Sequence, residues 1–295
     1  MEPKILHYAI TLANEKNFTK AARKLHMAQP SLSYQISKLE KDLGVQLFHR
    51  ENEVSPTYAG KVFISHAIQI IDQFQQLKSE IIDVAEMIKG QLLIGSLAST
   101  GAYLLPKTIS TFKDRFPGIE LVLIEDTSVQ LQSMISRGQL EIALMSMPIS
   151  NVELEKETIL EEDILLAVSP NHWLASYEEA DLKDCKDESF ILIKEGYHFR
   201  KNTYDLCVQS GFEPKIVFDS ININTCESLV TAGVGISFVP RMIVDNFKMS
   251  ENPVYLPIKA ENINPKREIV IAYKNNRYLS KAARSFINIM RELYK

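Results

Sequence analysis

The residues best suited to recognition chemistry gather between Asn17 and Arg50, where polar and basic side chains follow helical spacing. Apolar residues recur there at i, i+4, i+7 and i+11, which predicts one buried helical stripe formed by Leu32, Ile36, Leu39 and Leu43. The opposite face carries hydroxyls, an amide and cations, which suit DNA base edges and phosphates. The candidate DNA contacts are Thr19, Arg23, Gln29, Pro30, Ser31, Ser33, Tyr34, Ser37, Lys38 and Arg50.

The elements around this face predict two helices joined by a very short turn. We expect the Thr19 hydroxyl to cap the first helix and Pro30 to open the second, because proline at a first helical turn loses no hydrogen bond. Gly44 ends the second helix as a left-handed cap. This arrangement is typical of a helix-turn-helix DNA reader, although spacing alone also fits two packed helices of any all-α domain.

A second group of polar residues follows predicted strands in the rest of the chain. Short apolar runs at 92–95, 119–125 and 142–145 alternate with helical patterns at 103–116 and 130–138, the rhythm of a parallel sheet. Free amides at the helix starts attract anions. We therefore expect a ligand pocket formed by Ser99, Thr100, Thr127, Ser128, Tyr197 and His198; alternatively, these hydroxyls only cap helices.

A long helix is predicted to join the two parts. From residue 58 to residue 89 the only glycine is Gly60, and no proline occurs. Apolar residues alternate at spacings of three and four, which favours a two-stranded dimer helix over packing on its own domain. The predicted dimer contacts are Ile64, Ile71, Phe74, Ile81 and Ile88.

Charge and composition limit the functions that remain. Residues 1–90 carry 11 Lys and Arg against 10 Asp and Glu, and the remainder carries 22 against 27, so DNA affinity has to come largely from base contacts and dimerisation. We expect no transmembrane segment, signal peptide, metal site or cofactor, because the apolar runs are short and the six histidines are scattered. No hydrolase elbow or metalloprotease pair occurs, which argues against an enzyme.

The segment from Phe18 to Arg50 closely resembles the amino-terminal signature of LysR-type transcriptional regulators. The family pattern is matched at Phe18, Thr19, Ala21, Ala22, Leu25, Gln29, Pro30, Ser33, Ile36, Leu39, Glu40, Leu43, Gly44, Leu47, Phe48 and Arg50. Two departures concern the DNA contact. The segment from Glu51 to Thr57 is acidic and one residue shorter than the family's basic wing, and Tyr34 stands where arginine is common.

The resemblance extends over nearly the whole chain and implies its domain organisation. The implied fold is a winged helix-turn-helix domain at 1–57, a linker and dimerisation helix at 58–89, and a two-lobed α/β effector domain at 90–295 that is similar to periplasmic binding proteins. Lobe I would hold about 90–161 and 267–295, and lobe II about 162–266. The six hydroxyl-rich loop positions match the family's effector pocket.

The function expected from residues and resemblance together is that of a cytoplasmic transcriptional regulator. It would bind double-stranded DNA as a homodimer or homotetramer and respond to a small polar or anionic effector between its lobes. Two alternatives stay open: a redox-sensing regulator that acts through Cys207 and Cys226, and an α/β ligand-binding protein that does not bind DNA. The cysteine spacing and the lack of nearby basic residues do not indicate reactive thiols.

Overall fold

The computed structural model describes residues 2–50, 54–84, 90–246, 252–259 and 263–294. It divides the chain into two compact units. One comprises Met1–Val84 with Arg137–Gln139, and the other comprises Ala85–Ser136 with Leu140–Lys295. In the described residues, no helix combines the length and apolar character needed to cross a membrane.

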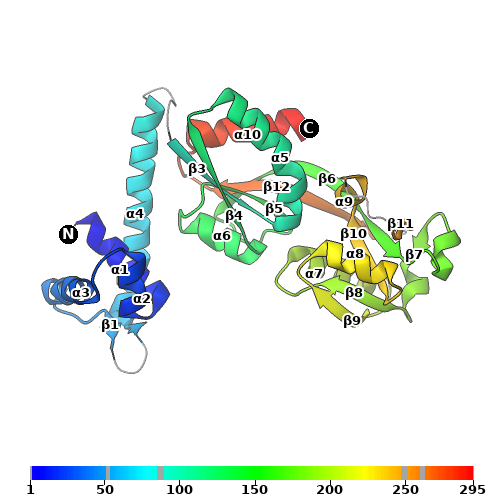
Figure 1. The fold of residues 1–295 in the computed structure, drawn as a ribbon, viewed down its shortest axis with the longest axis horizontal. Helices are drawn as coiled ribbons and strands as arrows, with labels where there is room; N and C mark the ends of the chain where they lie inside the picture. Colours follow the sequence, from blue (N-terminus) through cyan, green and yellow to red (C-terminus); the bar gives the residue numbers. More distant parts are fainter. Residues whose placement is uncertain (1, 51–53, 85–89, 247–251, 260–262, 295) are drawn as a thin grey trace. The chain divides into compact units, whose positions relative to one another are not determined.

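The first unit is a small helical domain followed by a long helix (Figure 1). Its core lies between the first three helices and a two-stranded hairpin, and includes Leu12, Leu32, Ile36 and Phe48. Gly44 adopts φ +68° and ends the third helix, as predicted. The elements are α1 (Pro3–Glu15), α2 (Phe18–Lys24), α3 (Gln29–Leu43), β1 (Phe48–His49), β2 (Ser55–Pro56) and α4 (Tyr58–Val84).

Two local predictions in this unit are wrong. Thr19 lies inside α2, and Asn17 caps that helix instead by accepting a hydrogen bond of 3.0 Å from the Lys20 amide. Leu43 is 40% exposed, whereas Glu40 is buried on the inner side of α3. After α3 the chain folds back over this helix at Leu47. The backbone amides there require a buried acceptor, and an apolar side chain does not supply one.

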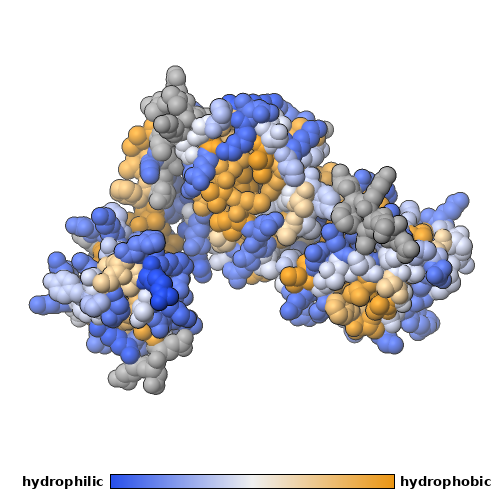
Figure 2. All heavy atoms as spheres, in the orientation of Figure 1, coloured by the Kyte–Doolittle hydropathy of each residue, from blue (hydrophilic) through white to orange (hydrophobic). Residues whose placement is uncertain are grey.

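Helix α4 packs against α1 near its beginning and exposes apolar side chains further on. Of the predicted dimer positions, Ile64 is half-buried against the core of its own unit, and Ile71 is half-buried. Phe74 and Ile81 are 55% and 62% exposed, and Ile88 lies outside the described residues. Figure 2 shows apolar atoms gathered along this helix, where the exposed stripe consists of Ile70, Phe74, Leu77 and Ile81.

The second unit has two lobes, and lobe I contains a sheet in the order β4-β3-β5-β12-β6. Strands β3, β4 and β5 are parallel, whereas β12 runs antiparallel to both β5 and β6. The predicted parallel sheet is therefore only part of a mixed sheet. The elements are β3 (Gly90–Ser96), α5 (Ala98–Arg115), β4 (Ile119–Glu125), α6 (Ser128–Ser136), β5 (Ile142–Ser146), β12 (Lys266–Lys274) and α10 (Lys281–Tyr294).

Strand β6 (Leu154–Val168) continues from one lobe into the other. Its first part pairs with β12 in lobe I, and residues from Ile164 onward pair with β10 and β11 in lobe II. The lobe II sheet then runs β6-β10-β8-β9. Its elements are β7 (Ala180–Asp181), β8 (Ser189–Ile193), α7 (His198–Gln209), β9 (Lys215–Ser220), α8 (Ile223–Thr231), β10 (Ile236–Pro240), α9 (Arg241–Asn246) and β11 (Val254–Lys259), with single 3-10 turns at Trp173–Ser176 and Leu182–Cys185.

Candidate functional site

The outer face of α3 presents most of the side chains predicted to contact DNA. Tyr34 is 66% exposed, and Ser33 and Ser37 are half-buried at the flanks of the face. No side chain caps the start of α3. Pro30 has no N–H and the Ser31 amide donates to the Ala28 carbonyl at 3.1 Å, which leaves the Gln29 amide for an anion such as a phosphate. The exposed members of the predicted set are Thr19, Arg23, Gln29, Pro30, Ser31, Tyr34, Lys38 and Arg50.

Arg50 is held by contacts within its own domain. Its Nη2 donates to Glu40 Oε2 at 2.7 Å and to Ser37 Oγ at 3.0 Å, and its guanidinium lies 5.7 Å from the centre of the Phe18 ring. The Glu40 Oε1 atom accepts from the amides of Leu47 and Phe48 at 2.8 and 3.1 Å. This network fixes the hairpin against α3, a positioning role that the sequence did not reveal. The acidic segment from Glu51 to Glu53 lies outside the described residues.

The predicted ligand loops of lobe I meet at one edge of the sheet. Strands β3, β4 and β5 are parallel, so their carboxyl ends lie together, and α5 and α6 begin there. Ser99 and Thr100 lie within the first turn of α5, because that helix begins at Ala98, five residues before the predicted start. Its N-cap, Leu97, has no side-chain acceptor, so the first amides of the helix face the edge uncapped.

Two of these hydroxyls are not helix caps. Thr100 and Ser128 are fully buried, and neither Thr100 Oγ1 nor Ser128 Oγ has a hydrogen-bond partner in the described parts of the chain. Thr127, in contrast, accepts a long hydrogen bond of 3.4 Å from the Gln130 amide, as a cap of α6 does. Buried polar atoms are normally paired, so the two hydroxyls leave hydrogen-bonding capacity for water or a ligand at this edge.

The remaining predicted residues come from the start of α7 in lobe II. Tyr197 is the N-cap of α7, without a side-chain bond to the helix, and is half-buried. His198 Nδ1 lies 3.0 Å from the carbonyl oxygen of Ser146, the last residue of β5. A carbonyl only accepts, so Nδ1 carries the proton and donates. This bond brings a third helix amino end to the strand edge, where the three helix dipoles together favour an anion.

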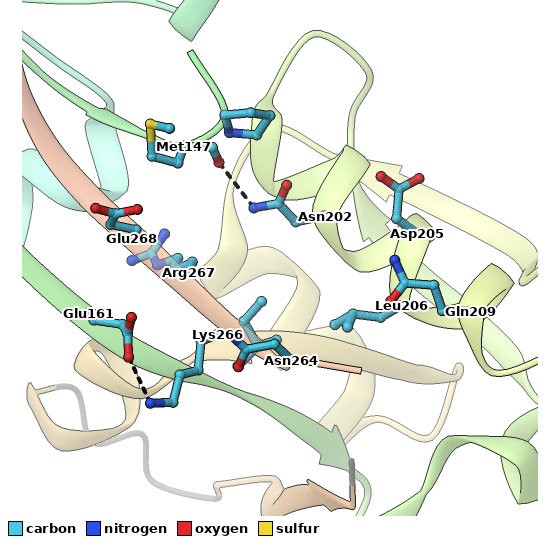
Figure 3. Close-up of a pocket in the computed structure, with 12 residues that line it drawn as sticks. Met147, Glu161, Asn202, Asp205, Leu206, Gln209, Asn264, Lys266, Arg267 and Glu268 are labelled. Atoms are coloured by element: carbon cyan, nitrogen blue, oxygen red, sulfur yellow. Dashed lines mark hydrogen bonds and ion pairs between the residues drawn. The ribbon is translucent and has the colours of Figure 1, made fainter. Parts of the chain in front are cut away.

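A cavity of about 390 Å³ lies one turn further along α7, and sequence reasoning missed it (Figure 3). None of the six predicted effector residues lines it. Its walls come from the end of β5, from α7 and from the two crossing strands, whose pairing joins residues about a hundred positions apart in the sequence. The lining residues are Met147, Pro148, Glu161, Ile164, Asn202, Asp205, Leu206, Gln209, Asn264, Lys266, Arg267 and Glu268.

Arg267 is a buried cation at the wall of this cavity. It is 2% exposed, its Nε donates to Glu162 Oε1 at 2.6 Å, and its guanidinium lies 5.5 Å from the centre of the Phe199 ring. Burial lowers the pKa of Arg267, and the Glu162 carboxylate opposes that effect. Nη2 of Arg267 has no hydrogen-bond partner within the described ranges.

The three cysteines are buried free thiols. Burial raises the pKa of Cys207 to about 12 and that of Cys226 to about 11, so both remain protonated at neutral pH. A protonated, enclosed thiol reacts slowly with peroxide, which argues against the redox alternative. In the described segments, no three His, Cys, Asp or Glu side chains are grouped to hold a metal ion.

Comparison with known proteins assigns a family to both units. The family model described as "Bacterial regulatory helix-turn-helix protein, lysR family" matches residues 3–61, and the "LysR substrate binding domain" model matches residues 85–295. The HTH-type transcriptional regulator YcgK of Bacillus subtilis (strain 168) is 36% identical, and the alignment covers 100% of this chain and 95% of that protein.

Two further relatives extend the comparison. The hydrogen peroxide-inducible genes activator of Dickeya chrysanthemi is 30% identical over 91% of this chain and 88% of its own length. The crystal structure of full-length CbnR in complex with its target DNA aligns with a TM-score of 0.69 at 23% identity, covering 99% of each chain. At that identity the structural likeness shows a shared fold.

Proposed function

The chain belongs to the LysR family of bacterial DNA-binding transcriptional regulators, and from that premise we propose how it reads DNA and senses an effector. Its helix-turn-helix domain binds double-stranded DNA, and its second unit is the effector-binding domain. We propose that the protein acts by binding and not by turnover, and that it works in the cytoplasm, where its DNA target lies.

The proposed reading face is the outer side of α3. The observation that carries this proposal is that Gln29, Ser31, Tyr34 and Lys38 are exposed along one helix whose start has no side-chain cap, which suits insertion into a major groove. The structurally aligned CbnR was crystallised with its target DNA. We place Arg50 and Ser37 in a supporting role, because they bond to each other and Arg50 pairs with Glu40.

The reading face is tested with a double substitution, Ser33→Ala with Lys38→Ala, in a gel-shift assay on the DNA upstream of the protein's own gene. We expect the shift to disappear while the oligomer, measured by light scattering, is unchanged. Glu15→Ala with Lys24→Ala is the matched control, because that exposed ion pair of 2.6 Å lies away from α3. Unchanged binding by the α3 variant would remove this face from the DNA contact.

The proposed effector site is the strand edge where α5, α6 and α7 begin. The buried hydroxyls of Thr100 and Ser128 carry this proposal, because neither has a hydrogen-bond partner in the described residues and each can therefore donate to a ligand acceptor. Three helix amino ends favour a small polar or anionic molecule at this edge. Ser99, Thr127, Tyr197 and His198 complete the proposed site.

The effector site is tested with Ser99→Ala and Thr127→Ala together, and separately with Thr100→Val and Ser128→Ala together. Each pair should leave promoter binding intact and blunt the response to an effector identified from a panel of carboxylate metabolites by thermal shift. The second pair should have the larger effect, because its hydroxyls have no partner among the residues that the structure describes. A dose curve unaltered by both pairs would rule out this edge.

We also propose that α4 forms the dimer contact through Ile70, Phe74, Leu77 and Ile81. These side chains are exposed and recur at spacings of four, three and four, the pattern of a two-stranded helical seam. Two copies joined in this way would present two reading helices to paired half-sites in DNA. Of the positions predicted from sequence, Phe74 and Ile81 belong to this stripe, and Ile64 serves its own domain.

The redox alternative rests on Cys207 and Cys226, whose burial and raised pKa values disfavour it. The similarity to a hydrogen peroxide-inducible activator keeps it worth one experiment. Peroxide treatment should leave the DNA affinity of the unmodified protein unchanged, and it should likewise leave that of Cys207→Ser unchanged.

A further inference from the structure

The cavity beside α7 is separate from the proposed effector site. His198 faces the strand edge, whereas Asn202, one turn further along the helix, donates to the Met147 carbonyl at 3.2 Å and lines the cavity. Its volume of about 390 Å³ lies within the range of small-molecule sites. Met147 and Pro148 follow the lobe I strand β5, and α7 belongs to lobe II, so both lobes contribute walls.

The charges lining the cavity do not balance within the protein. Lys266 is paired with Glu161 at 2.7 Å, and Arg267 is paired with Glu162, which does not line the cavity. Two carboxylates then remain. Glu268 accepts a hydrogen bond from the neutral Thr158 hydroxyl, and neither Glu268 nor Asp205 has a cationic partner in the described part of the chain. Each of these carboxylates therefore has room for a cation as its partner.

On the opposite wall of the cavity, Arg267 requires an anion as a partner. Arg267 is 2% exposed and keeps Nη2 without a partner among the residues that the structure describes. In Figure 3 its guanidinium and the Asp205 carboxylate lie on opposite walls. A buried guanidinium with a free N–H is best satisfied by a carboxylate, with which it forms a charge-assisted hydrogen bond.

We propose that this cavity is a second ligand site, and that it binds a small zwitterion of the α-amino acid class. The ammonium group contacts Asp205 on α7, and the carboxylate accepts from Arg267 on the opposite wall. The Asn202, Gln209 and Asn264 amides supply further hydrogen bonds, and the ligand side chain packs on Met147, Pro148, Ile164 and Leu206. Because both lobes line the cavity, its occupation would also affect how the lobes are held together.

The test uses the full-length protein and the standard L-amino acids as probes. Thermal-shift measurements at millimolar concentration should identify at least one amino acid that raises the melting temperature. Calorimetry then compares that amino acid with its decarboxylated amine and with its deaminated acid. Both truncated probes should bind at least about tenfold more weakly, since each loses one charged contact. No stabilising amino acid, or equal binding of a truncated probe, would overturn the proposal.

Variants locate the site. Asp205→Asn should weaken binding of the amino acid by about tenfold or more, while Glu195→Gln, an exposed acid that does not line the cavity, should leave it unchanged. Melting curves without ligand show that each variant is folded. Ser128→Ala separates the two sites: it should leave amino-acid binding intact. If Ser128→Ala abolished amino-acid binding and Asp205→Asn had no effect on it, the ligand would be assigned to the strand edge.

Discussion

The reading face of α3 and the strand edge of the effector domain present similar polar groups, but these groups are mostly exposed on α3 and buried at the strand edge. Both place hydroxyls beside an uncapped helix start. On α3 the polar side chains are mostly exposed, as Tyr34 and Lys38 are, whereas Thr100 and Ser128 at the strand edge are completely buried. The exposed face suits a partner too large to be enclosed, and the buried hydroxyls suit a small molecule that the lobes surround.

This difference also separates the energetic consequences of substitution in the two regions. An exposed side chain has water as its alternative partner, so replacing it costs binding but little stability. A buried unpaired hydroxyl already reduces stability, so replacing it removes a ligand contact and a folding penalty at once. Variants that separate binding from stability therefore test the comparison.

The largest expected effect comes from α4, the part of the first unit that exposes apolar side chains. Phe74→Glu with Ile81→Glu places carboxylates in the proposed seam and should convert the dimer to a monomer in light-scattering measurements. Promoter affinity should fall by on the order of a hundredfold, because a monomer engages one half-site. Gln69→Glu with Gln73→Glu is the control, since both glutamines are exposed on the same helix. A dimeric Phe74/Ile81 variant would refute the seam.

An effect of similar size, but on stability, is expected at Glu40, the buried group behind the reading face. Glu40→Ala removes the acceptor of the Leu47 and Phe48 amides and the partner of Arg50. It should lower the free energy of unfolding by about 3 kcal/mol in urea titrations, the cost of a broken buried charged network. Glu15→Ala, which breaks an exposed pair with Lys24, should cost less than about 1 kcal/mol. Equal losses would deny Glu40 its supporting role.

The two regions also differ in how far the sequence predicts them. The inner stripe of α3 follows from local periodicity, and its members Leu32, Ile36 and Leu39 are buried as predicted. Leu43 is exposed and Glu40 is buried, because the chain at β1 places two backbone amides beside the last turns of α3, where they require a buried acceptor. Helix α5 begins five residues early because Gly101, a residue type that usually weakens helices, is accommodated inside it.

The cavity beside α7 lay beyond local reasoning. In sequence, the charged run Lys266-Arg267-Glu268 suggests a solvent-exposed surface. Arg267 is nevertheless buried, because β12 pairs with β6 and the Arg267 guanidinium packs on the Phe199 ring. Only the long-range pairing of crossing strands brings these groups together. The strand-end loops were found because parallel strands place their carboxyl ends at one edge whatever the sequence between them.

A third prediction compares two buried threonines on the same helix. Thr100→Val removes a hydroxyl that has no partner in the described residues and should raise the free energy of unfolding by up to about 1 kcal/mol. Thr108→Val removes a hydroxyl that donates to the Leu104 carbonyl at 2.8 Å and should lower it by about 1 kcal/mol. Chemical denaturation without effector measures both. Destabilisation by both substitutions would mean that Thr100 is satisfied in the ligand-free protein.

The smallest expected effect is a pH dependence at Glu227, a carboxyl in lobe II that is 1% exposed. Burial raises its pKa above the ordinary value of 4.5, and the Tyr255 hydroxyl, which donates to Oε1 at 2.5 Å, offsets this only in part. As the pH rises above 4.5, the unfolded chain loses its proton before the folded one does, so the carboxyl progressively reduces stability toward neutral pH.

Glu227→Gln keeps an acceptor for Tyr255 and cannot ionise. Its free energy of unfolding relative to the unmodified protein should therefore increase as the pH rises from 4.5 toward neutrality. Urea titrations across that interval give the difference, and Glu195→Gln, which replaces an exposed carboxyl, should show no such trend. If the difference instead declined with pH, the ionised carboxylate would be stabilised in the fold. Glu227 would then be a buried polar group whose interactions are already satisfied in the fold, in contrast to the hydroxyls of Thr100 and Ser128.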